Sequence, residues 1–143
     1  MDDSVVSNSN EVNRLDSTLQ TLPLWKKKVL IVDDDEVNST VIGDFAEELG
    51  AIVVKAVDGY EAIQCAIENV PDFIFMDLHM PYFGGIESIQ LLRQKKIVAP
   101  IIALSASTRL HEKQQSIEAG ATDFITKPAK REVIHHVLLS YLK

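Results

Sequence analysis

Residues 29–36, Val-Leu-Ile-Val-Asp-Asp-Asp-Glu, join a run of branched apolar residues to three consecutive aspartates. Such a run is typical of a strand that is buried on both faces, as the strands of parallel sheets are. Carboxylates that follow this strand lie beyond its carboxyl end, where open parallel sheets bind their ligands. The stretch therefore predicts both a fold class and the location of a site.

Four further apolar runs repeat the first half of this pattern. Their starts lie roughly 20 to 30 residues apart, which leaves room for one helix in each gap. Five strand–helix units with right-handed crossovers predict an α/β fold, a (βα)5 doubly wound sheet of five parallel strands in the flavodoxin-like order 2-1-3-4-5. The four runs are Ile52–Val54, Phe73–Met76, Ile101–Leu104 and Phe124–Ile125.

The segments between the runs carry apolar residues at helical spacing. We expect these stripes to be the faces that pack on the sheet. The predicted stripes are Val37, Val41, Phe45 and Leu49; then Ile63, Ile67 and Val70; and finally Ile134, Leu138 and Leu142.

Length and charge limit the remaining classes. A chain of 143 residues has room for one compact domain with a modest extension. The formal net charge of −7 and the scattered basic residues argue against direct binding to nucleic acid. The single cysteine, Cys65, fits a reducing compartment, and no apolar run approaches the ~18 residues of a membrane span. We therefore expect a cytoplasmic protein that does not insert into membranes.

Residues 1–25 differ in composition from residues 26–143, which we expect to form the domain. Within this extension Val12, Leu15, Leu19 and Leu22 recur at helical spacing. So short a helix needs a surface to dock on, either its own domain or a second subunit. We expect a docked or dimer-forming helix, with a frayed tail as the alternative.

Reactive side chains follow four of the five predicted strands. Asp33 and Asp34 follow the first, Asp77 the third, Ser105 the fourth and Lys127 the fifth. Carboxylates gathered at one rim repel each other unless a cation lies among them, and hard oxygen ligands without His or Cys favour Mg²⁺, with Mn²⁺ as a substitute. With its charge compensated in this way, the central Asp77 is the best candidate for a nucleophile toward phosphorus.

These residues resemble the receiver domain of two-component response regulators, of the CheY-like single-domain type or the type found in hybrid kinases. The resemblance covers residues 28–143. It rests on the blocks Ile31–Asp34, Met76–Pro81 followed by Gly84-Gly85, Ala103–Ala106, and Gly120-Ala121 leading to Thr126–Pro128.

The resemblance implies a phosphorylation site and a metal site. Asp77 is then the phospho-acceptor, and Asp33, Asp34, Asp77 and the backbone carbonyl of His79 are the ligands of Mg²⁺. His79 and Ser107 occupy positions that resemble the family's modulators of dephosphorylation.

The resemblance also implies a switch. Ser105 and Lys127 would contact the phosphoryl group, and the peptide bond between Lys127 and Pro128 would be cis. When Ser105 moves toward the phosphoryl group, Phe124 would enter the vacated space. This would alter the face made by the fourth helix, fifth strand and fifth helix of the repeat.

The implied partners are a histidine kinase or a histidine phosphotransfer protein as donor and an effector protein as target. Because no output domain follows Lys143, we expect the signal to leave by binding another protein or by transfer of the phosphoryl group to a second histidine. Dimerisation through the switch face is a further expectation. Such a protein is a signalling domain and not an enzyme, apart from catalysing its own phosphorylation and dephosphorylation.

Two other classes share parts of the pattern. A haloacid-dehalogenase-type phosphatase would use Asp33 as nucleophile, but the chain lacks a later acidic pair after Lys127 and leaves Asp77 without a role. A flavodoxin relative would present hydroxyls and amides to a phosphate after its first strand. Three aspartates at that position disfavour it.

Overall fold

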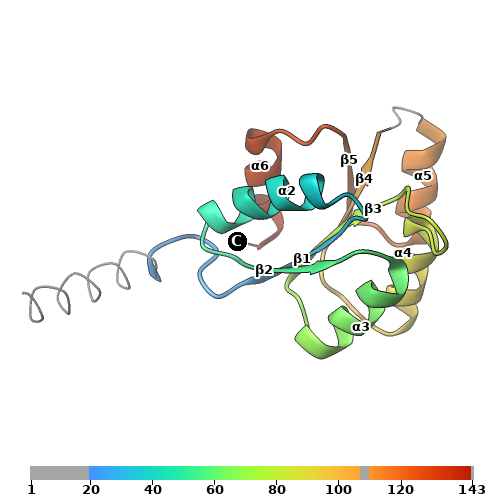
Figure 1. Cartoon of the computed structure of the whole chain (residues 1–143), viewed down its shortest axis with the longest axis horizontal. Coiled ribbons are helices and arrows are strands. Elements are labelled where there is room, and N and C mark those ends of the chain that lie inside the picture. The colour runs from blue at the N-terminus through green and yellow to red at the C-terminus, as the bar shows by residue number, and fades with distance from the viewer. Residues whose placement is uncertain (1–19, 107–109, 143) are drawn as a thin grey trace, which may run out of the picture.

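The computed structural model describes residues 20–106 and 110–142, and these alternate strands with helices (Figure 1). The predicted helix at Val12–Leu22 lies almost wholly outside the described residues, as does Ser107. All five predicted strands are confirmed. The strands are β1 (Lys28–Val32), β2 (Ile52–Ala56), β3 (Phe73–Asp77), β4 (Ile101–Ser105) and β5 (Asp123–Thr126). The helices are α2 (Glu36–Glu48), α3 (Gly59–Asn69), α4 (Gly85–Gln94), α5 (Leu110–Ala119) and α6 (Arg131–Leu142).

The strands form one parallel sheet in the predicted order, β2-β1-β3-β4-β5. In the register of this sheet Val32 pairs with Met76 and Asp77 with Leu104. The carboxyl ends of β1, β3 and β4 are therefore level with one another. Because the chain order reverses between β1 and β3, the residues that follow these strands lie at the crevice where doubly wound sheets bind ligands.

Helices cover both faces of the sheet, with α2 and α6 on one face and α3, α4 and α5 on the other (Figure 1). The core under α2 and α6 includes Ile42 and Leu138, and the core on the opposite face includes Ile89 and Leu92. Strands β3 and β4 are buried along their whole length. None of the helices in the described part of the chain is long and apolar enough to cross a membrane.

The predicted buried face of α2 is wrong at Val37 and Val41, whereas Phe45 and Leu49 pack against the core as predicted. Val37 and Val41 are 71% and 42% exposed, and the residues that face the sheet are Ser39, Ile42, Gly43 and Ala46. The helix lies close to the strands, since a Cβ placed on Gly43 would be 3.4 Å from Cγ1 of Val53. Small residues permit this approach, and Val37 and Val41 lie on the exposed side of the helix.

The stripe predicted for α3 is confirmed at Ile63 and wrong at Ile67 and Val70, and the stripe on α6 is confirmed. Ile67 and Val70 are exposed, whereas α3 packs through Gly59, Ala62, Ile63 and Ala66. On α6, Ile134 and Leu138 are fully buried, and Leu142 packs against the same core. Residue size at the contact, and not only helical spacing, therefore decides which face is buried.

The packed part of the chain begins before Lys26. Leu24 is fully buried, and its backbone N–H donates to the carbonyl of Leu49 at 2.8 Å. Gly50 adopts φ +95°, and a Cβ on it would lie 2.8 Å from Cβ of Leu22. The boundary expected between residues 25 and 26 thus falls within a turn that packs on the end of α2, and Leu24 is its anchor.

Candidate functional site

The aspartates that follow β1 have different local roles. Asp35 is the N-cap of α2, and its side chain accepts hydrogen bonds from the backbone N–H groups of Val37 and Asn38. Asp33 accepts a hydrogen bond from the backbone N–H of Asp35 at 2.8 Å, which fixes the loop. The helix cap therefore uses one aspartate and leaves Asp33 and Asp34 to face the crevice.

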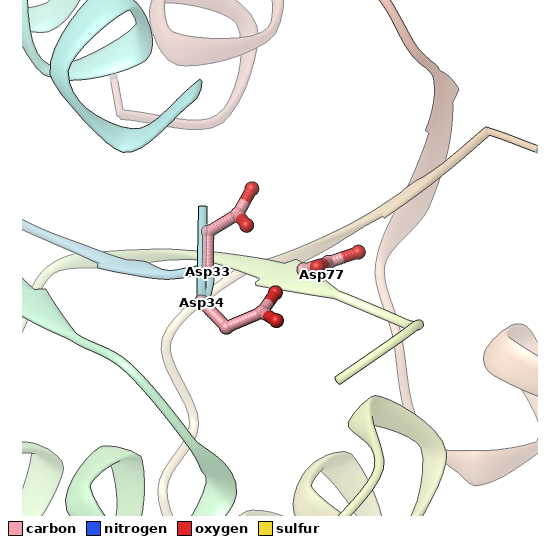
Figure 2. Close-up of side chains that lie close together, drawn as sticks. All are labelled: Asp33, Asp34 and Asp77. Atoms are coloured by element: carbon pink, nitrogen blue, oxygen red, sulfur yellow. The ribbon is translucent and has the colours of Figure 1, made fainter. Parts of the chain in front are cut away.

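Asp33, Asp34 and Asp77 form a cluster at the carboxyl ends of β1 and β3 (Figure 2). Each can contribute a carboxylate oxygen that lies within 4.8 Å of the other two. Asp33 and Asp77 are buried, and Asp34 is exposed. The cluster is thus built into the domain but open to solvent on one side. A pocket lined in part by Asp33, Asp34, Lys55 and Val57 adjoins it.

Lys127 places its ammonium group between the two buried carboxylates. Its Nζ lies 3.2 Å from Oδ2 of Asp33 and 3.1 Å from Oδ1 of Asp77. The backbone N–H of Lys127 donates to the carbonyl of Ser105 at 2.7 Å, which ties the end of β5 to the end of β4. The bond between Lys127 and Pro128 is cis. The segment after β5 therefore places the ammonium of Lys127 beside Asp77, the expected phospho-acceptor at the end of β3.

The electrostatics of the cluster perturb Asp77. Burial and the neighbouring Asp33 carboxylate raise the pKa of Asp77 to about 6, although the backbone N–H of His79 and the ammonium of Lys127 act in the opposite direction. Burial disfavours the charged form of Lys127, but the carboxylates of Asp77 and Asp33 outweigh it, and the pKa of Lys127 is raised. One ammonium thus leaves the negative charge of the cluster incompletely compensated.

The donor set fits Mg²⁺ or Mn²⁺. It consists of carboxylate oxygens without sulfur or imidazole, which are the ligands of hard divalent cations. Burial and the Asp33 carboxylate both raise the pKa of Asp77, and a divalent ion would favour the ionised carboxylate against both. The backbone N–H of His79 donates to Oδ1 of Asp77 at 3.2 Å, so the residue lies at the cluster, and its carbonyl as a ligand stays a prediction.

Ser105 has a partner that the sequence did not predict. This residue ends β4 and is fully buried, and its hydroxyl donates to the carboxylate of Glu112, in the first turn of α5. Nε2 of His79 lies 2.7 Å from Oε1 of Glu112 and 3.3 Å from Oγ of Ser105. The only signal in the sequence is an acidic residue in the first turn of the helix after β4, which is common for helices in general.

The structure thus brings together most of the predicted site residues. One cluster contains Asp33, Asp34, Asp77 and Lys127. Ser105 lies next to this cluster, because its carbonyl accepts a hydrogen bond from the backbone N–H of Lys127. The predicted switch residue Phe124 is set apart. It pairs with Ala103 on β4 and is partly buried against the core under α3 and α4.

Comparison with known proteins gives the family. The sequence profile described as "Response regulator receiver domain" matches residues 29–139, and the chain belongs to this family of signalling domains. It is 41% identical over 108 residues to the alkaline phosphatase synthesis transcriptional regulatory protein PhoP of Bacillus subtilis, covering 75% of this chain and 45% of that protein. It is 34% identical over 115 residues to the autoinducer 2 sensor kinase/phosphatase LuxQ of Vibrio vulnificus, covering 80% of this chain and 13% of that protein.

Solved structures agree with the fold. The chemotaxis protein CheY4 of Vibrio cholerae superposes with a TM-score of 0.78 at 30% identity, covering 82% of this chain and 99% of that chain. The receiver domain of the Francisella response regulator 1452 superposes with a TM-score of 0.73 at 34% identity, covering 82% and 100%. The chain spans less than half the length of PhoP and of LuxQ. The family match favours a receiver over a phosphatase that uses Asp33.

Proposed function

We propose that the chain is a phospho-accepting receiver in which the Asp77 carboxylate takes a phosphoryl group from a phosphohistidine on a histidine kinase or a histidine phosphotransfer protein. The observation that carries this proposal is the position of Asp77. It is a buried carboxylate on the central strand, clustered with Asp33 and Asp34 and paired with the ammonium of Lys127. Each of these groups has a function in the transfer.

The transfer exchanges one bond to phosphorus for another. An oxygen of Asp77 attacks phosphorus, the phosphorus–nitrogen bond to the donor imidazole breaks, and the electron pair returns to that imidazole, which takes up a proton. The product on this chain is an acyl phosphate. The attacking group must be ionised, and with a pKa of about 6 most of Asp77 is ionised above neutral pH.

The surrounding residues supply charge and position. Asp33, Asp34, Asp77 and the His79 carbonyl would hold Mg²⁺ or Mn²⁺, which when bound shields the carboxylates and stabilises charge on the phosphoryl oxygens. Lys127 already lies between Asp33 and Asp77 and would follow the phosphoryl oxygens with its flexible ammonium. Because the ammonium of Lys127 already lies beside Asp77, only a small movement would bring it to the phosphoryl oxygens, and little entropy would be lost in the transition state.

The phosphorylated state would differ on the face formed by α5, β5 and α6. A phosphoryl group adds about −1.5 to −2 charges and strong acceptor oxygens, which attract the Ser105 hydroxyl. Phe124 is partly buried on the strand next to Ser105 and could then repack. We propose that an effector, or a second copy of the chain, reads this face. In a phosphorelay the group would instead pass on to a second histidine.

A mass measurement tests the proposal. The protein with Mg²⁺ and phosphoramidate is expected to gain the mass of one phosphoryl group, which peptide mapping locates at Asp77. Asp77→Asn is expected to gain none. The matched control is Asp35→Asn, because asparagine also caps helices and the change removes a charge from the loop that holds Asp33 and Asp34. Absence of label on the unaltered protein would refute the proposal, and label at Asp33 in Asp77→Asn would favour the phosphatase alternative.

The extension has a separate test. We propose that residues 1–19 contribute a docking or dimer-forming segment, while Leu22 and Leu24 belong to the domain. Deletion of residues 1–19 leaves both leucines in place. An unchanged mass in solution and an unchanged melting temperature after the deletion would argue against docking and against dimerisation through this segment.

A further inference from the structure

We propose that Glu112 is an internal anion that holds the Ser105 hydroxyl in the unphosphorylated protein and has to be displaced when Asp77 is phosphorylated. This inference rests on the proposed function and adds a residue to it. In this view Glu112 weakens the affinity of the site for a phosphoryl group and links that site directly to α5.

The hydroxyl of Ser105 carries a single proton. A serine hydroxyl has one proton to donate, and an ionised carboxylate can only accept. Ser105 Oγ donates to Oε1 of Glu112, so this proton is engaged within the domain. A phosphoryl oxygen on Asp77 can therefore receive it only if the bond to Glu112 breaks.

Glu112 is held in place by more than one contact. Its side chain is 15% exposed, whereas that of His79 is 60% exposed. Nε2 of His79 lies 2.7 Å from the same Oε1 that accepts from Ser105. The backbone N–H of His79 in turn donates to Oδ1 of Asp77. Glu112 is therefore connected to the loop of the acceptor aspartate as well as to the end of β4.

The charge of Glu112 also opposes phosphorylation. The phosphoryl group would bring about −1.5 to −2 charges to a site that shares its hydrogen-bond donor with Glu112. Like charges that are partly buried repel more strongly than they do in water. Both the competition for the Ser105 proton and the repulsion act against Glu112 in the phosphorylated state.

Because Glu112 belongs to α5, its displacement would change the contacts of that helix. Residue 112 is in the first turn of α5, and the helix starts at Leu110. Release of Glu112 frees the start of α5 from the end of β4. Phosphorylation can thus affect α5 directly, because Glu112 is a side chain of that helix. This effect adds to any movement of Phe124.

Beryllofluoride, a stable mimic of a phosphoryl group on aspartate, tests the inference with Mg²⁺ and the full chain. We expect Glu112→Ala to bind it more tightly than the unaltered protein, on the order of tenfold, since a hydrogen bond to a charged group is lost from the unbound state only. Glu112→Gln keeps the shape and an acceptor oxygen, and should show a smaller gain. Glu118→Gln removes a charge from an exposed position on the same helix and should bind as the unaltered protein does.

A double-mutant cycle separates this role from a merely structural one. In the Ser105→Ala background the gain from Glu112→Ala should shrink to the part caused by charge repulsion, because no hydroxyl remains to be released. Equal affinities of the unaltered protein, Glu112→Gln and Glu112→Ala would overturn the inference and leave the proposed function intact. A gain of the same size with and without Ser105 would also overturn it. Failure of the unaltered protein both to bind beryllofluoride and to accept a phosphoryl group would overturn the two together.

Discussion

Substitution of Asp77 by asparagine should stabilise the metal-free protein. The carboxylate of Asp77 is buried beside Asp33, and this raises its pKa from 3.8 to about 6. A folded-state pKa above the unfolded value means that the folded protein binds more protons between these two pH values. The free energy of unfolding therefore falls as the pH rises from about 4 to about 6, and stays lowered above that range. Asparagine carries no charge and removes this loss.

The size of the effect follows from the same shift. A pKa that rises from 3.8 to about 6 corresponds to at most about 3 kcal/mol at neutral pH. Asp34 in the same cluster is exposed, and water on this side screens the charge of Asp77. We therefore expect Asp77→Asn to raise the free energy of unfolding by about 1–2 kcal/mol. For a chain of this size that is a rise in melting temperature of about 3–6 °C.

Thermal unfolding in EDTA at a series of pH values measures this difference. The melting temperatures of Asp77→Asn and of the unaltered protein should coincide near pH 4, diverge through about pH 6 and approach a constant gap above about pH 7, where most of Asp77 is ionised. Added Mg²⁺ should raise the melting temperature of the unaltered protein and have much less effect on Asp77→Asn, since a ligand stabilises only the state that binds it. An Asp77→Asn protein that is less stable than the unaltered one at pH 7 in EDTA would refute the reasoning.

Three further substitutions test other parts of the structure. Leu24→Ala removes a fully buried side chain and should lower the free energy of unfolding in urea by about 2–4 kcal/mol; no measurable loss would mean that this turn does not belong to the core. Gly85→Ala would place a Cβ 2.3 Å from the carbonyl oxygen of Asp77 and should cost about 2 kcal/mol or more, despite the higher helix propensity of alanine; a more stable variant would contradict the close approach. Lys127→Met keeps the apolar stem without the ammonium and should slow phosphorylation by phosphoramidate about a hundredfold in a mass-spectrometric time course, whereas an unchanged rate would exclude a role in charge stabilisation.

The sheet and the acidic cluster were predictable because each rests on a short-range rule. A buried parallel strand must be apolar along its length, and Val29–Val32 and Ile101–Leu104 satisfy this without help from distant residues. Once the strands are known, their carboxyl ends define where the polar residues meet. Asp33, Asp77 and Lys127 come together from positions far apart in the chain for this reason alone.

The helix faces and the contact of Glu112 depend on three-dimensional fit, which helical spacing does not carry. Val37 and Val41 have the right spacing for a buried face, but the distance between α2 and the sheet selects Gly43 and Ala46 instead. Glu112 meets Ser105 only because of how α5 lies against the end of β4. Acidic residues are common in the first turn of helices because they interact favourably with the helix dipole. Nothing in the sequence distinguishes Glu112 from such a residue.

The anchor at Leu24 has a consequence for modular use of the domain. Leu24 is joined to Leu49, and Lys27 directly precedes the amino end of β1. Asp33 follows the other end of that strand, about 16 Å away for five residues at 3.3 Å each. A reporter fused directly to residue 20 would accordingly be attached near the end of the domain opposite the aspartate cluster, away from the site that an incoming donor has to reach.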